Sequence, residues 1–178
     1  MRKDNAICFC GSIVICLALT SLANSQQPKA APPAPVPAQI TAAKRVFVSN
    51  AGGVSFGTVF EEVVFNGGPD RPYNQFYDAM KSWGRHELVT TPADADMILK
   101  VRWALSDTGL KLPVLGQLDV EITDPKTNAT LWTLDEYVRG AILLGNRDKN
   151  FDRAMATIVD RMKKLVEPPG AVSDASAK

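Results

Sequence analysis

The sequence predicts an α/β (α+β) fold in which one mixed, mainly antiparallel sheet of about five strands carries two helices on a single face. Within residues 93–138, three segments alternate apolar and polar residues with the period of two that marks strands with one buried face. Two other segments, 73–83 and 151–165, repeat apolar residues at helical spacing and can cover that face. The expected architecture is a two-layer sandwich with the order β-α-β-β-β-β-α.

The chain opens with the features of an export signal. Two basic residues precede an apolar stretch over residues 6–22, and small residues at signal-peptidase spacing end at Ser25. We expect residues 1–25 to be removed by cleavage between Ser25 and Gln26. The apolar stretch is also near the length of a membrane-spanning helix, so an uncleaved inner-membrane anchor is the alternative. The signal predicts a periplasmic or secreted protein, with membrane attachment only if cleavage fails.

The cysteines and the charge balance exclude several classes of protein. All three cysteines lie inside the signal, so the mature chain has no thiol for a disulfide or a metal site, and none stands in a lipoprotein signal context. The chain has 20 basic and 19 acidic residues. Because a nucleic-acid surface needs clustered excess positive charge, we expect no nucleic-acid partner. No motif for a cofactor is present.

The flanks of the folded domain differ from it in composition. Residues 26–39 read QQPKAAPPAPVPAQ, and a Pro/Ala-rich run of this kind favours polyproline II and is interpreted as a semi-rigid linker. A single α/β domain is expected over residues 40–167. Residues 168–178 are small and polar and are expected to form a disordered tail.

The first half of the domain is expected to contain a strand, a helix and a second strand. The strand covers 45–49, is expected to be buried on both faces, and ends in a turn over 50–53. Residues 54–70 allow a hairpin, a short helix or a lid. Asp70 is the expected cap of a helix that Gly84 ends in the left-handed conformation. The strand over 87–90 should then lie parallel to the first.

Three consecutive antiparallel strands are expected next, over residues 97–105, 117–123 and 131–137. If the apolar faces of the first two strands align, Lys100 and Arg102 share the other face with Asp119 and Glu121. Opposite charges across strands contribute up to about 1 kcal/mol per pair and oppose a slip of the register.

The last helix is expected over 151–165, with Asp148 or Asn150 as its N-cap. The glycine, Asn and Asp content of residues 140–150 indicates a loop before it. The apolar residues 142–144 within that loop are expected to be buried.

Two glycine-rich segments, NAGGVSFG and FNGGPDRP, are candidates for an anion site because the second opens into a helix N-terminus beside an arginine. Neither has the lysine and the glycine spacing of a phosphate loop or a dinucleotide fingerprint. The candidate ligand-binding residues are Gly52, Gly53, Gly67, Gly68, Asp70, Arg71 and Arg147.

Catalytic and metal-binding patterns are weak. His86 is the only histidine, and no serine stands in a nucleophile-elbow context, so we interpret it as a partly exposed turn residue. Asp94 and Asp96 lie on the same side of an extended stretch and could hold a divalent cation, but acids at a strand start more often keep a sheet edge soluble. No catalytic residue and no metal site are therefore predicted.

Several phrases occur in a familiar order: VFVSN, PYNQFYDAMKSWGRHELV, ADADMILKV, ITDPKTNATLW and GNRDKNFDRAMATIVDRMKKL. This order, over residues 44–165, resembles small uncharacterised exported proteins of bacteria. More distantly it is similar to the α/β domains of the curli-secretion lipoprotein and of the Tol-Pal periplasmic component. The resemblance implies a fold and a cell-envelope setting but transfers no catalytic residue. The missing lipoprotein signal is a departure from the lipoprotein relatives.

These observations lead to the hypothesis of a non-enzymatic periplasmic or secreted binding or accessory module of the cell envelope, with an envelope protein as its partner. A small-ligand (anion) binding protein that uses the glycine-rich loops is the first alternative. A hydrolase that uses His86 is the second.

Overall fold

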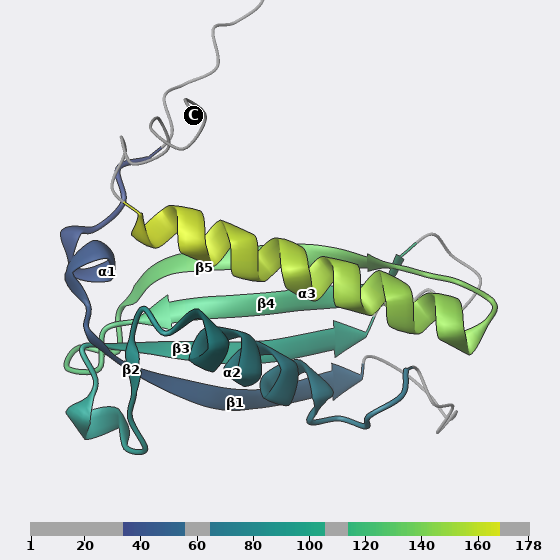
Figure 1. Ribbon diagram of the computed structural model, residues 1–178, viewed down its shortest axis with the longest axis horizontal. Helices are drawn as coiled ribbons and strands as arrows, with labels where there is room; N and C mark the ends of the chain where they lie inside the picture. The colour runs from purple at the N-terminus through teal and green to yellow at the C-terminus, as the bar shows by residue number, and fades with distance from the viewer. Residues whose placement is uncertain (1–33, 56–64, 106–113, 168–178) are drawn as a thin grey trace, which may run out of the picture. The chain divides into compact units, whose positions relative to one another are not determined.

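The computed structural model describes residues 34–55, 65–105 and 114–167 (Figure 1). The predicted signal, its cleavage site at Ser25 and Gln26, most of the linker and the predicted tail lie outside these residues and stay predictions. Residues 56–64, most of the segment that the sequence left open, lie outside them as well.

The described residues form one five-stranded sheet with two long helices. The elements are α1 (Ala38–Ala42), β1 (Arg45–Ser55), α2 (Arg71–Trp83), β2 (Glu87–Leu88), the 3-10 helix η1 (Pro92–Asp94), β3 (Met97–Leu105), β4 (Val114–Thr123), β5 (Thr130–Arg139) and α3 (Leu144–Val166). The strand order is β2-β1-β3-β4-β5. β1 is parallel to both of its neighbours, and the other pairs are antiparallel. The predicted order β-α-β-β-β-β-α is confirmed, with α1 and η1 added.

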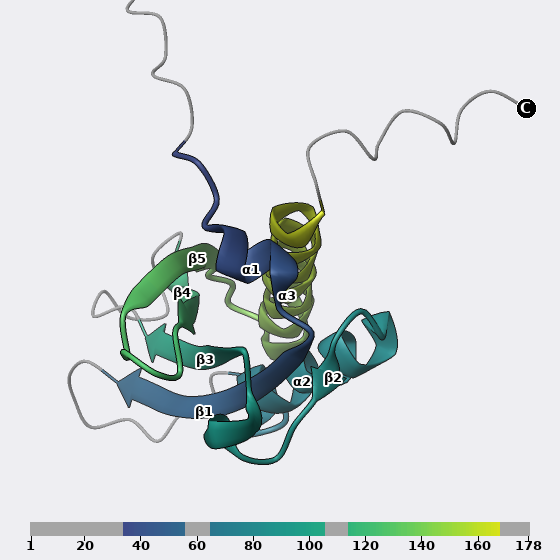
Figure 2. The ribbon, with the colours of Figure 1, turned by 90° about the vertical axis from the view of Figure 1, so that its left-hand side faces the viewer.

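Both long helices lie on the same face of the sheet (Figures 1 and 2). Their apolar stripes meet the apolar side of the strands in one continuous core. Each large side chain buried there contributes about 1.5–3 kcal/mol before entropy is subtracted. The fully buried members include Phe76, Met80, Leu99, Leu118, Ile122, Phe151, Ile158 and Met162. Among the described residues, no helix is both long and apolar enough to cross a bilayer.

The predicted charge pairing between β3 and β4 is confirmed in register. Lys100 lies opposite Glu121, and Arg102 lies opposite Asp119. The Arg102 guanidinium is 3.1 Å from Asp119, and the Lys100 ammonium is 4.0 Å from Glu121. Both pairs stand on the face away from the helices, where a one-residue slip would separate them and expose the apolar side chains.

The start of α3 differs from the sequence-based expectation. The helix begins at Leu144, so residues 144–150, which were expected to be a loop, form its first two turns. Asp148 and Asn150 therefore lie inside the helix instead of capping it. Asp148 accepts hydrogen bonds from Asn66 and Arg71, and Asn150 donates to the Arg139 carbonyl. These distant partners outweigh the weak helix propensity of the segment.

β1 is longer than expected and is buried on one face. The expected turn at 50–53 is an irregularity in the pairing with β3, after which the strand continues to Ser55. Gly52 adopts φ +79 there, and its N–H donates to the Asn50 side chain at 2.9 Å. Val46 and Val48 are buried, whereas Phe47 is half-exposed, because no helix covers the second face.

α2 is bounded by the expected residues, Asp70 and Gly84, but only Gly84 makes the expected capping interaction. Gly84 adopts φ 66 and its N–H donates to the Met80 carbonyl, which confirms the left-handed stop. Asp70 is the N-cap by position, but its side chain makes no capping bond and instead accepts a hydrogen bond from Asn50 at 2.8 Å.

Gly116 on β4 gives a test of the core packing. A Cβ atom at this position would lie 2.6 Å from the Trp103 ring and still closer to the Ala104 carbonyl oxygen. We expect Gly116→Ala to lower the free energy of unfolding by about 1–3 kcal/mol through overpacking. In Gly145→Ala, where a Cβ meets open space, stability should stay equal or rise by up to about 1 kcal/mol. Urea denaturation of both variants measures the difference, and equal stability would contradict the packing of Trp103 on Gly116.

Candidate functional site

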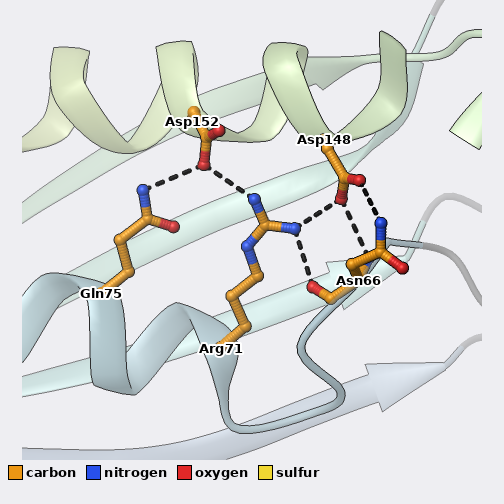
Figure 3. Close-up of polar contacts among 5 residues, drawn as sticks. All are labelled: Asn66, Arg71, Gln75, Asp148 and Asp152. Atoms are coloured by element: carbon orange, nitrogen blue, oxygen red, sulfur yellow. Dashed lines mark hydrogen bonds and ion pairs between the residues drawn. The ribbon is translucent and has the colours of Figure 1, made fainter. Parts of the chain in front are cut away.

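A polar cluster joins the beginning of α2 to the beginning of α3 (Figure 3). One terminal nitrogen of Arg71 donates to Asp148 at 2.5 Å and to the Asn66 carbonyl at 2.7 Å. The other donates to Asp152 at 2.7 Å, and Gln75 donates to the same oxygen at 3.0 Å. Asn66 donates both its backbone N–H and its side-chain amide to Asp148. We call these five residues the Arg71 cluster.

Aromatic rings form the inner side of the Arg71 cluster. The guanidinium carbon of Arg71 lies 4.7 Å from the centre of the Phe151 ring and 5.5 Å from that of Phe65. These two rings and Trp103 pack against one another at centroid distances of 4.5–5.8 Å. Gly67 lies against the aliphatic part of Arg71, since a Cβ there would be 3.1 Å from its Cδ. Only 17% of the Arg71 side chain is exposed.

The charges of the Arg71 cluster are of opposite sign and stabilise one another. Partial burial by itself would raise the pKa of Asp148, but hydrogen bonds from Arg71 and Asn66, together with the Arg71 charge, outweigh it. The pKa of Asp148 therefore lies below its ordinary value of 3.8. The Arg71 guanidinium contacts two carboxylates of α3 and the Asn66 carbonyl. These contacts link the start of α2 to the start of α3.

The seven predicted ligand-binding residues lie partly together. Asp70 and the Asn50 side chain connect the segment of Gly67, Gly68 and Arg71 to the irregularity of β1 that contains Gly52. Gly53 lies against Trp103, and Arg147 is buried in the first turn of α3. The structure thus brings the two glycine segments near each other, an arrangement that the sequence analysis did not address. It also places Arg71 against internal acids, a pairing that the sequence did not predict. Ligand binding by these residues stays a prediction.

His86 is buried, which corrects the expectation of a partly exposed turn residue. The residue is only 6% exposed. Its Nδ1 lies 3.1 Å from the Ala43 carbonyl, and its ring packs edge-on against Trp83. Burial is the largest effect on this imidazole and lowers its pKa. Its Nε2 is buried and has no hydrogen-bond partner among the described residues. A ring closed off in this way does not reach a substrate in solvent.

Asp94 and Asp96 have separate structural partners, one local and one distant in the sequence. Asp94 accepts a hydrogen bond from the Thr91 hydroxyl at 2.6 Å. Asp96 accepts the backbone N–H groups of Lys44 and Arg45 at 2.9 and 2.8 Å, and these bonds lower its pKa. Within the part of the chain that the structure describes, no group of three or more His, Cys, Asp or Glu side chains is placed to hold a metal ion.

An open cleft of about 580 Å³ lies next to α1 and the start of β1, away from the Arg71 cluster. Two of its lining residues are joined by a hydrogen bond, which the Gln39 side-chain amide donates to the Asp96 carbonyl at 3.2 Å. At another part of the lining, the Asp124 side chain accepts a hydrogen bond from the Lys126 N–H at 2.8 Å. The sequence contained no signal for this cleft, because its walls come from three separate segments and contain no motif. The lining residues are Gln39, Ala42, Ala43, Lys44, Ala95, Asp96, Asp124, Pro125 and Lys126.

The connection between β5 and α3 carries exposed apolar side chains. Ile142 is 90% exposed and Leu143 is 66% exposed, against the expectation that this apolar run is buried. The backbone here is held in place, since the N–H groups of Asn146 and Arg147 donate to the Leu143 carbonyl at 3.0 and 3.1 Å. We call residues 139–149 the β5–α3 tip.

The Arg71 cluster predicts a specific response to acid. Because the folded-state pKa of Asp148 is lowered, its contribution to stability is present above the unfolded-state value and is lost as the pH falls below about 4. In Asp148→Asn, the loss of stability between pH 6 and pH 3 should be smaller than in the unmodified chain. Asp160→Asn, on the exposed face of the same helix, is the matched control and should leave the slope unchanged. Denaturation curves over this pH range measure both, and identical slopes would contradict the pairing.

No protein-family model matches the chain, and no curated protein matches its sequence. Among solved structures, the chain is similar to a PelC dodecamer from Paraburkholderia phytofirmans, with 15% identity, a TM-score of 0.47, and coverage of 76% of this chain and 95% of that one. It is similar to the LpoB C-terminal domain from Salmonella enterica, with 10% identity, a TM-score of 0.38, and coverage of 53% and 82%. A third similarity is to uncharacterised lipoprotein B from Nitrosomonas europaea, with 10% identity, a TM-score of 0.31, and coverage of 76% and 88%. At these values the similarities assign neither a function nor a site to this chain.

Proposed function

We propose that this chain is a non-enzymatic binding or accessory module of the cell envelope. The export-type N-terminus and the Pro/Ala-rich linker support the envelope setting. The side chains that could carry chemistry have internal roles: His86 is buried, and Arg71 faces Asp148 and Asp152. A residue engaged in this way contributes to the fold and is not available to a substrate.

The exposure of Ile142 and Leu143 is the observation that carries the proposal. Burying one aliphatic side chain of this size is worth about 1.5–3 kcal/mol, so leaving two neighbours in water forgoes a sizeable gain. The hydrogen bonds to the Leu143 carbonyl hold them in the turn and oppose their folding back onto the core. Single exposed apolar residues are ordinary on protein surfaces, whereas adjacent ones on a fixed turn favour a contact with another surface.

Site-specific photocrosslinking in cells tests this proposal. The full-length chain carries a photoreactive amino acid at position 142 or, as a matched control, at position 160, which is exposed on the middle of α3. We expect a discrete adduct from position 142, detected by gel shift and mass spectrometry, and none from position 160. Reaction with water alone at position 142, or the same adducts at both positions, would contradict a binding role for this surface.

A second candidate function, binding of a small anion, is favoured by the cleft beside α1. Asp96 and Asp124 already accept backbone N–H groups there. The ammonium groups of Lys44 and Lys126 form no salt bridge with another described residue, and they are the positive charges available to a ligand. This cleft replaces the glycine segments as the preferred place for such a ligand.

A thermal-shift titration with phosphate and citrate tests the second candidate. Binding to the folded state should raise the Tm as the ligand concentration increases. At a ligand concentration of 100 Kd, the free energy of unfolding should increase by about 2.7 kcal/mol. The shift should disappear in the Lys44→Ala, Lys126→Ala double variant and persist in Lys149→Ala, which removes an exposed lysine at the other end of the domain. A Tm that does not respond in the unmodified chain would rule out anion binding in the cleft.

A further inference from the structure

We propose that the β5–α3 tip docks on an anionic lipid bilayer by inserting Ile142 and Leu143 among the headgroups. This inference rests on the proposed function and names the partner of the same surface. Three observations support it: the exposure of the two aliphatic side chains, the charges beside them, and the shape of the connection.

The apolar part of the tip is small and fixed. Ile142 and Leu143 are adjacent and are 90% and 66% exposed. They come directly before the first residue of α3, whose early N–H groups bond to the Leu143 carbonyl. Two aliphatic side chains presented by a turn whose Leu143 carbonyl already has partners can enter the boundary between headgroups and acyl chains without unfolding any helix or strand.

The charge beside the tip complements anionic lipid. Four basic and two acidic residues lie within positions 139–153. Both acids, Asp148 and Asp152, bind Arg71. The exposed basic residues of this stretch are Arg139, Lys149 and Arg153. Basic residues close to apolar side chains strengthen attachment to a negatively charged bilayer.

A hydrogen-bonded link holds two of these basic residues near each other. The Asn150 amide donates to the Arg139 carbonyl at 3.0 Å, and Arg153 donates to the Asn150 side-chain oxygen at 3.4 Å. The end of β5, which carries Arg139, is therefore joined to the part of α3 that carries Arg153, next to the apolar residues. Arg71 offsets one of the two acid charges, and the basic residues of this stretch outnumber the acidic ones, so this positive charge is not cancelled locally.

The shape of the tip favours a lipid surface over a protein. The connection between β5 and α3 lies at one extremity of the folded domain, where it projects beyond the strands (Figure 1). A stable protein interface buries about 800 Å² on each partner, far more than two aliphatic side chains supply. Pairing of two copies through this tip would also bring like charges together, whereas binding to an anionic bilayer combines the small apolar area with charge attraction and needs no complementary protein surface.

Photocrosslinking to vesicles tests the inference. The full-length chain, with a diazirine amino acid at position 142 or at the control position 160, is irradiated with vesicles of phosphatidylglycerol and phosphatidylethanolamine or of phosphatidylcholine alone. Because the adduct is local, it reports on the tip independently of the apolar N-terminal stretch. We expect lipid adducts at position 142 on the anionic vesicles and a marked excess over position 160.

The basic residues are tested separately. Substitution of Arg139, Lys149 or Arg153 by Gln should in each case lower the apparent affinity for the anionic vesicles about five-fold at low salt.

The outcomes separate this inference from the proposed function. Equal lipid labelling at positions 142 and 160, or labelling that is insensitive to lipid charge and to the three substitutions, would overturn bilayer docking. An adduct at position 142 with a second copy or with another protein in cells would overturn it as well, yet would keep the chain a binding module. The complete absence of adducts at position 142 in cells would overturn both the binding role and the docking on a bilayer.

Discussion

The guanidinium of Arg71 is the interaction on which the arrangement of the two helices depends. A cation that rests on two aromatic rings and is mostly removed from water requires compensating charge and hydrogen bonds. Asp148 and Asp152 supply the charge from α3, and the Asn66 carbonyl supplies a third acceptor. Because Arg71 opens α2 and its acids lie in the first turns of α3, one side chain fixes where both helices meet over the sheet. Removing both acids would leave a mostly buried positive charge without a partner of opposite sign, a more costly change than removing an exposed ion pair.

Much of the fold could be predicted because its determinants are local or pairwise. The period of two in β3 and β4, the opposite charges across them, and the apolar stripes of α2 and α3 all follow directly from residue order. Gly84 ends α2 in the left-handed conformation, as expected for a glycine at this position. The start of α3 could not be predicted, since Gly145, Asn146 and Asp148 indicate a loop and the partner of Asp148 is 77 residues away. Similarly, the continuation of β1 past Gly52 depends on its pairing with β3 rather than on its own residues.

The candidate surfaces were less predictable than the fold. The glycine segments do approach each other, but the role of Arg71 depends on acids from another helix, which no spacing rule indicates. The cleft beside α1 is lined by a few residues from each of three distant segments, so it leaves no recognisable pattern in any one stretch of sequence. The β5–α3 tip runs against the most general expectation of all, that an apolar run is buried. Ile142 and Leu143 violate it, and such violations concentrate where a protein contacts something else.

The position of β1 in the sheet affects how the chain assembles. β1 is the first strand in the sequence, yet it lies between β2 and β3, and it pairs Val46 with Met97 across 51 residues. β4 and β5 are joined by a short turn, so they pay little loop-closure entropy and can pair early. During synthesis or passage through a membrane from its N-terminus, the chain delivers β1 first, and neither of its neighbours follows until more than 30 residues after β1 ends. β1 must therefore stay unpaired for most of that passage, a period in which a chaperone would have a reason to hold it.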